Sequence, residues 1–385
     1  MMAGSIGSEV KPSYSVGNAS KCSIRLVLVG LVLYGVAPEA QPSGASGENN
    51  QEQAAMVSTV RAAFARKEVT PSGTVEMPGG FSKRFCEGAH DPLWVEAVVF
   101  ANDTVRVALV GVDALMVADD VVRSAREQAQ AHCGIPASHI LIAASHTHTG
   151  GPIIECFSSE RDPAYCTYVA QRIAEAIAEA DGALAEVEVA VGVGHEDSVA
   201  FNRRFFMKDG SVLTHPGKMN LDILKPAGPT DPEVAVIAVS DRAGKLVGCA
   251  VNYALHATTM SGNQLSADWP FYMRETVRGA LGADIGVVFL NGACGDVTQV
   301  DNQSARPSEF GQAWARRVGM TVGAEVLKVL ARAEFAEDVP LAVLTRSIEL
   351  PIRDLAQSDE MILARERPPH GLGSSVEEVW RRELA

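Results

Sequence analysis

Two histidines, one residue apart, follow a short apolar run in the middle of the chain. Residues 140–143 (Ile-Leu-Ile-Ala) have the composition of a buried strand and lead into Ala-Ser-His146-Thr-His148-Thr-Gly-Gly-Pro. Side chains two residues apart on a strand point to the same face, so both imidazoles should project together from its carboxyl end. Ligand sites in open α/β sheets collect at that edge. The pattern therefore predicts metal ligation or catalysis, with a pair of purely structural histidines as the alternative.

Apolar runs and helical periodicity alternate along the chain, which predicts an α/β fold: a mixed β-sheet flanked by helices in a single large domain. Turn residues split residues 93–112 and 233–255 into two hairpins, and residues 195–231 have no periodicity and predict a long functional or disordered loop. We find no internal sequence repeat. The predicted strands are 93–101, 104–112, 140–144, 186–192, 233–240, 246–255, 286–290 and 341–350, and the predicted helices are 119–133, 164–180, 269–281 and 308–333.

The amino-terminal segment has the pattern of a secretory signal peptide. Basic residues precede the apolar run 26–36, and small residues follow it, so residues 1–40 are predicted to be a signal and the protein to be secreted or periplasmic. The alternative is a start at Met56, which would leave the protein cytoplasmic. Residues 41–56 are polar and rich in Gly and Ser, which predicts a disordered linker.

Residues 57–385 are then predicted to form the catalytic domain. At its end, a helical pattern begins after Ser374 and reaches Ala385 without a capping residue, which predicts a domain that is incomplete at its carboxyl end.

Charge and cysteine spacing exclude several classes of function. The net charge of -14 argues against a nucleic-acid partner, which would need a basic patch, and nothing in the chain indicates a protein partner. The seven cysteines have no Cys-x-x-Cys spacing, which excludes zinc-ribbon and thioredoxin-like sites. Cys156 and Cys166 are the most plausible local disulfide pair.

Further chemistry-bearing residues follow other predicted strands. His256 ends the strand-like run 246–255 and could complete a metal site with the first pair. Asp268 precedes a helix, where it could cap the helix or orient a histidine ring. A glycine-rich turn contains Asn291, Gly295 and Asp296, and its exposed N–H groups could hold an oxyanion.

Taken in order, these motifs resemble the catalytic amino-terminal domain of the neutral/alkaline non-lysosomal ceramidase family. The resemblance covers residues 57–350. Within the family, the chain is more similar to the shorter bacterial relatives. The resemblance rests on residues 69–71, 90–93, 143–152, 202–203, 256–260, 266–268 and 291–298. It implies a zinc-dependent hydrolase of sphingolipid metabolism that cleaves the amide of ceramide, or of a related N-acyl lipid, with metal-activated water. A lipid substrate also implies peripheral contact with a membrane.

The resemblance assigns roles to individual residues. It implies that His146 and His256 bind Zn²⁺, and that His148 acts beside the metal on the reacting carbonyl or as a proton carrier. It places Arg203 in the substrate pocket. Thr298 stands where the family has a serine once regarded as the nucleophile.

The chain also departs from the family pattern. The family takes a glutamate and a tyrosine as further zinc ligands from Pro-Gly-Glu and Gly-Tyr-x-Pro motifs, and neither motif occurs after residue 300. Two alternatives therefore stay open. One is a metal hydrolase on the same scaffold that acts on a non-lipid amide or ester. The other is an inactive fragment that lacks two zinc ligands.

Overall fold

The structure is a computed structural model, and it describes residues 21–22, 59–337, 339–346 and 350–351. Apart from Lys21 and Cys22, the predicted signal peptide and linker lie outside the described residues, as does the helix predicted after Ser374. Lys21–Cys22 (β1) and Leu350–Pro351 (β15) pair antiparallel within a small unit of their own. No helix of the described part of the chain is long and apolar enough to cross a bilayer.

The main sheet of the described chain has eight strands in the order β13-β12-β11-β6-β2-β3-β4-β5. The pairs β12–β13 and β4–β5 are parallel and the other neighbours are antiparallel, so the predicted mixed sheet is confirmed. The strands are β2 (Arg61–Glu68), β3 (Trp94–Ala101), β4 (Arg106–Val112), β5 (Ile140–Ala144), β6 (Ala185–His195), β11 (Glu233–Asp241), β12 (Leu246–Tyr253) and β13 (Gly286–Asn291).

Four α-helices of the described residues complete this single body, and local capping chemistry sets an end of α1 and of α2. Asp162 caps α2 by accepting from Ala164 N at 2.8 Å, and Pro163 occupies the first helical position, where no backbone donor is needed. Gly134 ends α1 in the left-handed conformation, with a φ of 74°. The helices are α1 (Asp119–Cys133), α2 (Pro163–Gly182), α3 (Trp269–Leu281) and α4 (Gln312–Leu330), and a 3₁₀ turn, η1, spans Ala137–His139.

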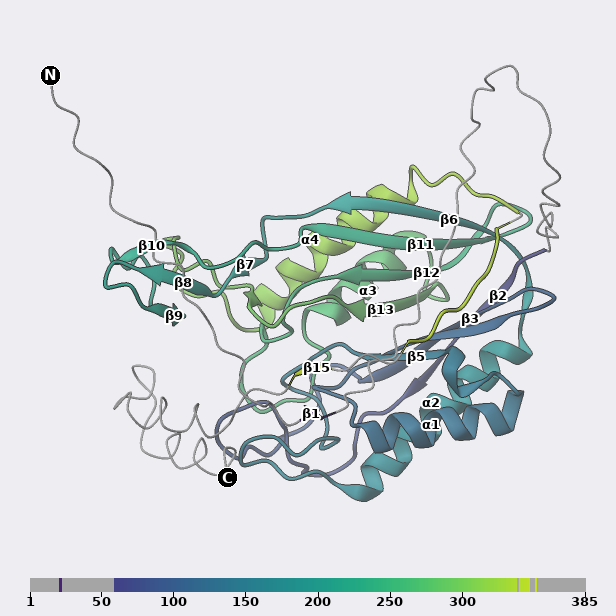
Figure 1. Ribbon diagram of the computed structural model, residues 1–385, viewed down its shortest axis with the longest axis horizontal. Coiled ribbons are helices and arrows are strands. Elements are labelled where there is room, and N and C mark those ends of the chain that lie inside the picture. The colour runs from purple at the N-terminus through teal and green to yellow at the C-terminus, as the bar shows by residue number, and fades with distance from the viewer. Residues whose placement is uncertain (1–20, 23–58, 338, 347–349, 352–385) are drawn as a thin grey trace, which may run out of the picture. The chain divides into compact units, whose positions relative to one another are not determined.

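The main sheet consists of two halves with the same order of elements. Each half has three antiparallel strands, then a helix, then a strand parallel to the third, then a second helix. The first half is β2-β3-β4-α1-β5-α2 and the second is β6-β11-β12-α3-β13-α4. In Figure 1 the second half lies above the first, and α1 and α2 line the lower side. The fold therefore contains a repeat of topology although no sequence repeat is detectable.

The two halves pack face to face between outer helices. Along β3, Val95, Ala97 and Val99 belong to the core beneath α1 and α2, whereas Val98 and Phe100 belong to a separate core shared with strands of the second half. This alternation is the period of two expected for a strand buried on both faces. The halves approach so closely that a side chain at Gly111 of β4 would come within 2.4 Å of the Phe289 carbonyl oxygen of β13.

Residues 195–231 differ from the predicted irregular loop, because much of this segment forms short strands. β7 (Phe201–Asn202) pairs with β14 (Val297–Thr298), and β8 lies between β9 and β10 in a small three-stranded sheet. We call residues 203–226 the wing. In Figure 1 it projects at the left, beyond the ends of the main strands. Its strands are β8 (Arg204–Met207), β9 (Val212–Thr214) and β10 (Ile223–Pro226).

Two further sequence predictions were wrong. Residues 341–346 are not a strand, because they pair with no other strand. Leu341 and its apolar neighbours pack against the core between the two halves, and this burial explains why their sequence has the apolar pattern of a strand. Residues 347–349 lie outside the described chain. Cys166 forms no disulfide with Cys156, because its thiol is free and donates to the Ile153 carbonyl.

Candidate metal centre

The three histidines lie where both parallel strand pairs end. His146 and His148 follow β5, and His256 follows β12. The two loops are bridged in parallel between Thr147 and Ala257. Asn291, at the end of β13, ties both loops together, because its amide donates to the carbonyls of Ser145 (3.0 Å) and Leu255 (3.2 Å). The two halves of the fold thus contribute to one cluster.

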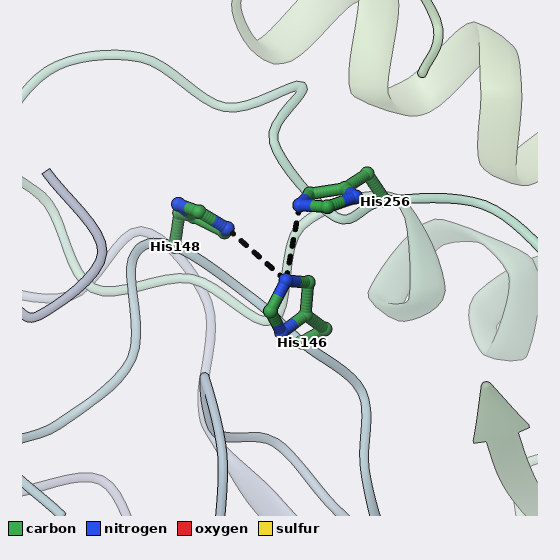
Figure 2. A group of neighbouring side chains, drawn as sticks. All are labelled: His146, His148 and His256. Atoms are coloured by element: carbon green, nitrogen blue, oxygen red, sulfur yellow. Dashed lines mark hydrogen bonds between the residues drawn. The ribbon is translucent and has the colours of Figure 1, made fainter. Parts of the chain in front are cut away.

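The Nε2 atoms of the three imidazoles point toward one another. His146 Nε2 is central: it lies 3.0 Å from His256 Nε2 and 3.4 Å from His148 Nε2 (Figure 2). All three candidate ligand atoms lie within 4.8 Å of one another. The group could therefore hold a metal ion.

Backbone carbonyls determine which ring nitrogens carry protons. His146 Nδ1 lies 2.7 Å from Leu115 O, His148 Nδ1 2.7 Å from Gly79 O, and His256 Nδ1 2.8 Å from Cys294 O. A carbonyl can only accept, so each Nδ1 donates. In the neutral rings every Nε2 then has a lone pair and no proton, and the short Nε2–Nε2 contacts are not hydrogen bonds. Three lone pairs that meet at one point fit a bound cation, and the carbonyls orient its ligands.

Burial keeps these imidazoles neutral. It lowers the pKa of His148 to about 3, with a further contribution from the neighbouring charge of His146. It lowers the pKa of His256 to about 4 and also lowers that of His146, although the backbone hydrogen bonds to Cys294 and Leu115 oppose these changes. The rings therefore have the protonation state that a metal requires at neutral pH.

Metal binding is expected to persist at lower pH than at an exposed histidine site. A proton and a metal compete for the same Nε2 lone pair, so affinity falls only below the pKa of the imidazoles. Exposed histidines, with a pKa of about 6.5, lose affinity from there downward. Here we expect the affinity to fall by less than about tenfold between pH 7 and pH 5. Chelator competition across this range measures it, and a loss of tenfold or more would contradict the expectation.

The similarity of this chain to known proteins lies in its three-dimensional structure. No protein-family model matches the chain, and no curated protein sequence matches it. A solved structure does: neutral ceramidase from Pseudomonas aeruginosa matches 74% of this chain and 46% of its own, with a TM-score of 0.60 and 19% identity. This chain has the ceramidase fold. A second structure, a ceramidase complexed with C2, matches 74% of this chain and 45% of its own, with a TM-score of 0.59 and 18% identity.

The similarity predicted from the order of motifs is therefore confirmed for the fold, and this chain spans less than half the length of either ceramidase chain. Within this ceramidase fold, the residues of the motif with the two histidines alternate in role. His146 and His148 face the cluster, whereas Thr147 and Thr149 are buried and donate to the Ser266 carbonyl at 2.7 and 2.9 Å. The Ser266 hydroxyl in turn donates to Asp91.

The predicted loop residues mainly hold the ceramidase fold together at the site. The Asn291 amide is used on backbone carbonyls, as described above. Gly295 accepts from Arg203 Nη2 at 2.5 Å, and Asp296 accepts from Asn202 Nδ2 at 2.8 Å and, through its carbonyl, from Arg203 N. Arg203 is thereby fixed beside the cluster, and after burial its charge is among the causes that lower the pKa of His146 and His256.

Thr298 and Asp268 are both buried and form hydrogen bonds within the fold. Thr298 is buried and its hydroxyl donates to Gln299 Oε1 at 3.2 Å, in a network that also holds Thr258, two residues after His256. Of the two roles predicted for Asp268, the structure has the helix cap: its oxygens accept from Met260 N (2.7 Å) and Trp269 N (2.6 Å) at the start of α3. The Nδ1 atoms of the three imidazoles are contacted by backbone carbonyls.

Sequence reasoning missed Gly79 and Leu115, whose carbonyls orient two of the rings. A carbonyl has no sequence signature, but the Gly79-Gly80 pair could have indicated a close approach. Gly79 has a φ of 101°, and a side chain there would come within 2.8 Å of His148 Nδ1. His215 was missed as well. The backbone N–H of His215 donates to the Arg203 carbonyl, and the charge of the His215 imidazole contributes to lowering the pKa of His256.

Proposed function

We propose that this chain is the catalytic part of a zinc-dependent hydrolase that cleaves the amide bond of ceramide or a related N-acyl lipid. The observation that carries the proposal is the convergence of three unprotonated Nε2 atoms in a ceramidase fold. Imidazole is a common ligand of catalytic zinc, and His146 and His256 would supply two such ligands, with His148 beside the ion. The lipid substrate is inferred from the ceramidase structures that share the fold.

Each residue of the proposed site would have a separate role in the hydrolysis. A bound zinc ion would polarise the amide carbonyl and lower the pKa of water to about 7. His146 and His256 would hold the ion. As water attacks the carbonyl carbon, its proton passes to His148 Nε2, which returns it to the amine as the C–N bond breaks, leaving a carboxylic acid and a free amine. Arg203 is anchored by Gly295 and has further N–H donors to stabilise the oxygen on which negative charge develops.

The test loads the full chain with zinc and measures both bound metal and released fatty acid. We expect about one zinc per chain, with hydrolysis of an N-acyl sphingosine faster than that of a soluble N-acetyl sugar or a peptide. His148→Gln should retain zinc but slow hydrolysis by about 100-fold or more. Absence of bound zinc would contradict the metal centre. Cleavage of only the soluble amides would favour the non-lipid alternative.

A further inference from the structure

The wing exposes an amphiphilic face. Phe206 of β8 stands in register with Val212 of β9 and Lys225 of β10, and Arg204 stands in register with Thr214. Phe206 and Val212 are each 39% exposed, and the Lys225 ammonium lies 5.5 Å from the centre of the Phe206 ring. The opposite side chains of β8, Phe205 and Met207, are buried. The sheet is therefore anchored by one face and presents the other to solvent.

Large aliphatic side chains extend this face at the turn before β10 and within that strand. Leu221 is 83% exposed and Leu224, at a register shift in β10, is 60% exposed. Leu221 is the most exposed large apolar side chain of the described residues. Isolated surface leucines are common, but this combination lies on one small sheet with a phenylalanine and a valine, which is a surface suited to burial.

The charge of the wing is opposite to that of the chain. Residues 203–226 contain five basic and two acidic side chains, whereas the whole chain has a net charge of -14. Arg203 lies beside the histidine cluster, and Lys218 is paired with the buried Glu309. Arg204 and Lys225 form no ion pair with any described residue. Two uncompensated cations thus flank the exposed apolar side chains.

We infer that the wing docks the protein on an anionic lipid surface. Apolar side chains that enter the acyl boundary and cations that meet anionic head groups are the two contributions that hold peripheral proteins at such surfaces. The inference rests on the proposed function, because an N-acyl lipid must be reached at a membrane. The wing is also continuous with the candidate site, since Arg203 N donates to Asp296 O and His215 N donates to Arg203 O.

The test measures binding of the full chain to phosphatidylcholine vesicles with and without phosphatidylglycerol, by co-sedimentation. We expect binding to the anionic vesicles that weakens with salt. Arg204→Gln/Lys225→Gln should weaken it about 25-fold, roughly fivefold for each cation. Leu221→Ser/Leu224→Ser should weaken it about tenfold or more. Lys245→Gln in the β11–β12 turn and Leu344→Ser, whose side chain is 56% exposed, are matched controls that should bind like the parent chain.

Two results would overturn the inference: no binding to anionic vesicles at low salt, or wing variants that bind like the parent chain. Self-association that is lost in the wing variants, measured by sedimentation velocity, would assign the face to a second copy of the chain instead. Metal content and hydrolysis of a detergent-dispersed substrate should be unchanged in the wing variants. The docking surface can therefore fail without the proposed function failing, and the reverse is also true.

Discussion

His146→Ala is expected to abolish metal binding and hydrolysis together. His146 Nε2 is the atom nearest to both other candidate ligand atoms, at 3.0 Å and 3.4 Å, so its removal leaves His148 and His256 without their common neighbour. Catalytic zinc sites usually have three protein ligands, and without His146 the proposed site would keep His256 as its one imidazole ligand. We expect zinc affinity to fall by more than about 100-fold and hydrolysis to fall to background.

Thermal or denaturant unfolding separates this effect from misfolding. With zinc at about 1,000 times its dissociation constant, the parent chain should gain about 4 kcal/mol of unfolding free energy and the variant almost none. Without metal, the variant should lose no more than about 1–2 kcal/mol, the value of its hydrogen bond to Leu115. His132→Ala, at the end of α1, is the matched control and should keep zinc. A His146 variant that still binds zinc tightly would exclude this metal centre.

Arg274→Met is expected to give the largest loss of stability. The Arg274 guanidinium is buried on α3, with Nη2 2.6 Å from Asp113 and Nε 3.6 Å from Glu96. Burial raises the pKa of Asp113, and the charge of Arg274 opposes that rise. Removing the arginine leaves a buried carboxylate without its counter-ion. Such a change costs about 3–5 kcal/mol of unfolding free energy, which urea denaturation would measure.

Two further measurements identify the cause. The pKa of Asp113 should rise further in the Arg274→Met variant. The unfolding free energy that this variant loses relative to the parent chain should therefore shrink as the pH falls and grow as the pH rises. Arg274→Met/Asp113→Asn should recover part of the loss, because the carboxylate that lies 2.6 Å from the arginine is then removed as well, whereas Glu96 keeps its ion pair with Arg278. Arg123→Met removes an exposed ion pair with Asp119 at 3.2 Å and should cost less than about 1 kcal/mol. Equal losses in both methionine variants would contradict the argument.

Local patterns in the sequence predicted much of the main body. The helices Asp119–Cys133 and Trp269–Leu281 and the strand Ile140–Ala144 have the predicted bounds, because turn and capping residues flank them. The convergence of His146 and His256 was also predictable, since both follow strands that end at the same edge. The strand Arg61–Glu68 was missed because its charged residues hide the alternation that pairing with β3 imposes.

Long-range packing could not be read from the chain. The two halves share the order of their helices and strands but not their residues. The repeat of topology is therefore not detectable in the sequence. Similarly, the partners of the imidazole N–H groups are the backbone oxygens of Leu115, Gly79 and Cys294, which any residue could supply. For Asp268 the sequence left a helix cap and a histidine-orienting role open, because a sequence shows side-chain partners and not backbone ones.

The division of the sheet into two halves also predicts when the ligand set forms during folding. Each half has a hydrophobic core that includes its own pair of helices, and His146 and His148 come from one half and His256 from the other. The complete ligand set comes into existence only when the halves dock. We therefore expect a metal ion to bind only after the two halves have packed together. It would slow their separation and leave the earlier folding steps unchanged.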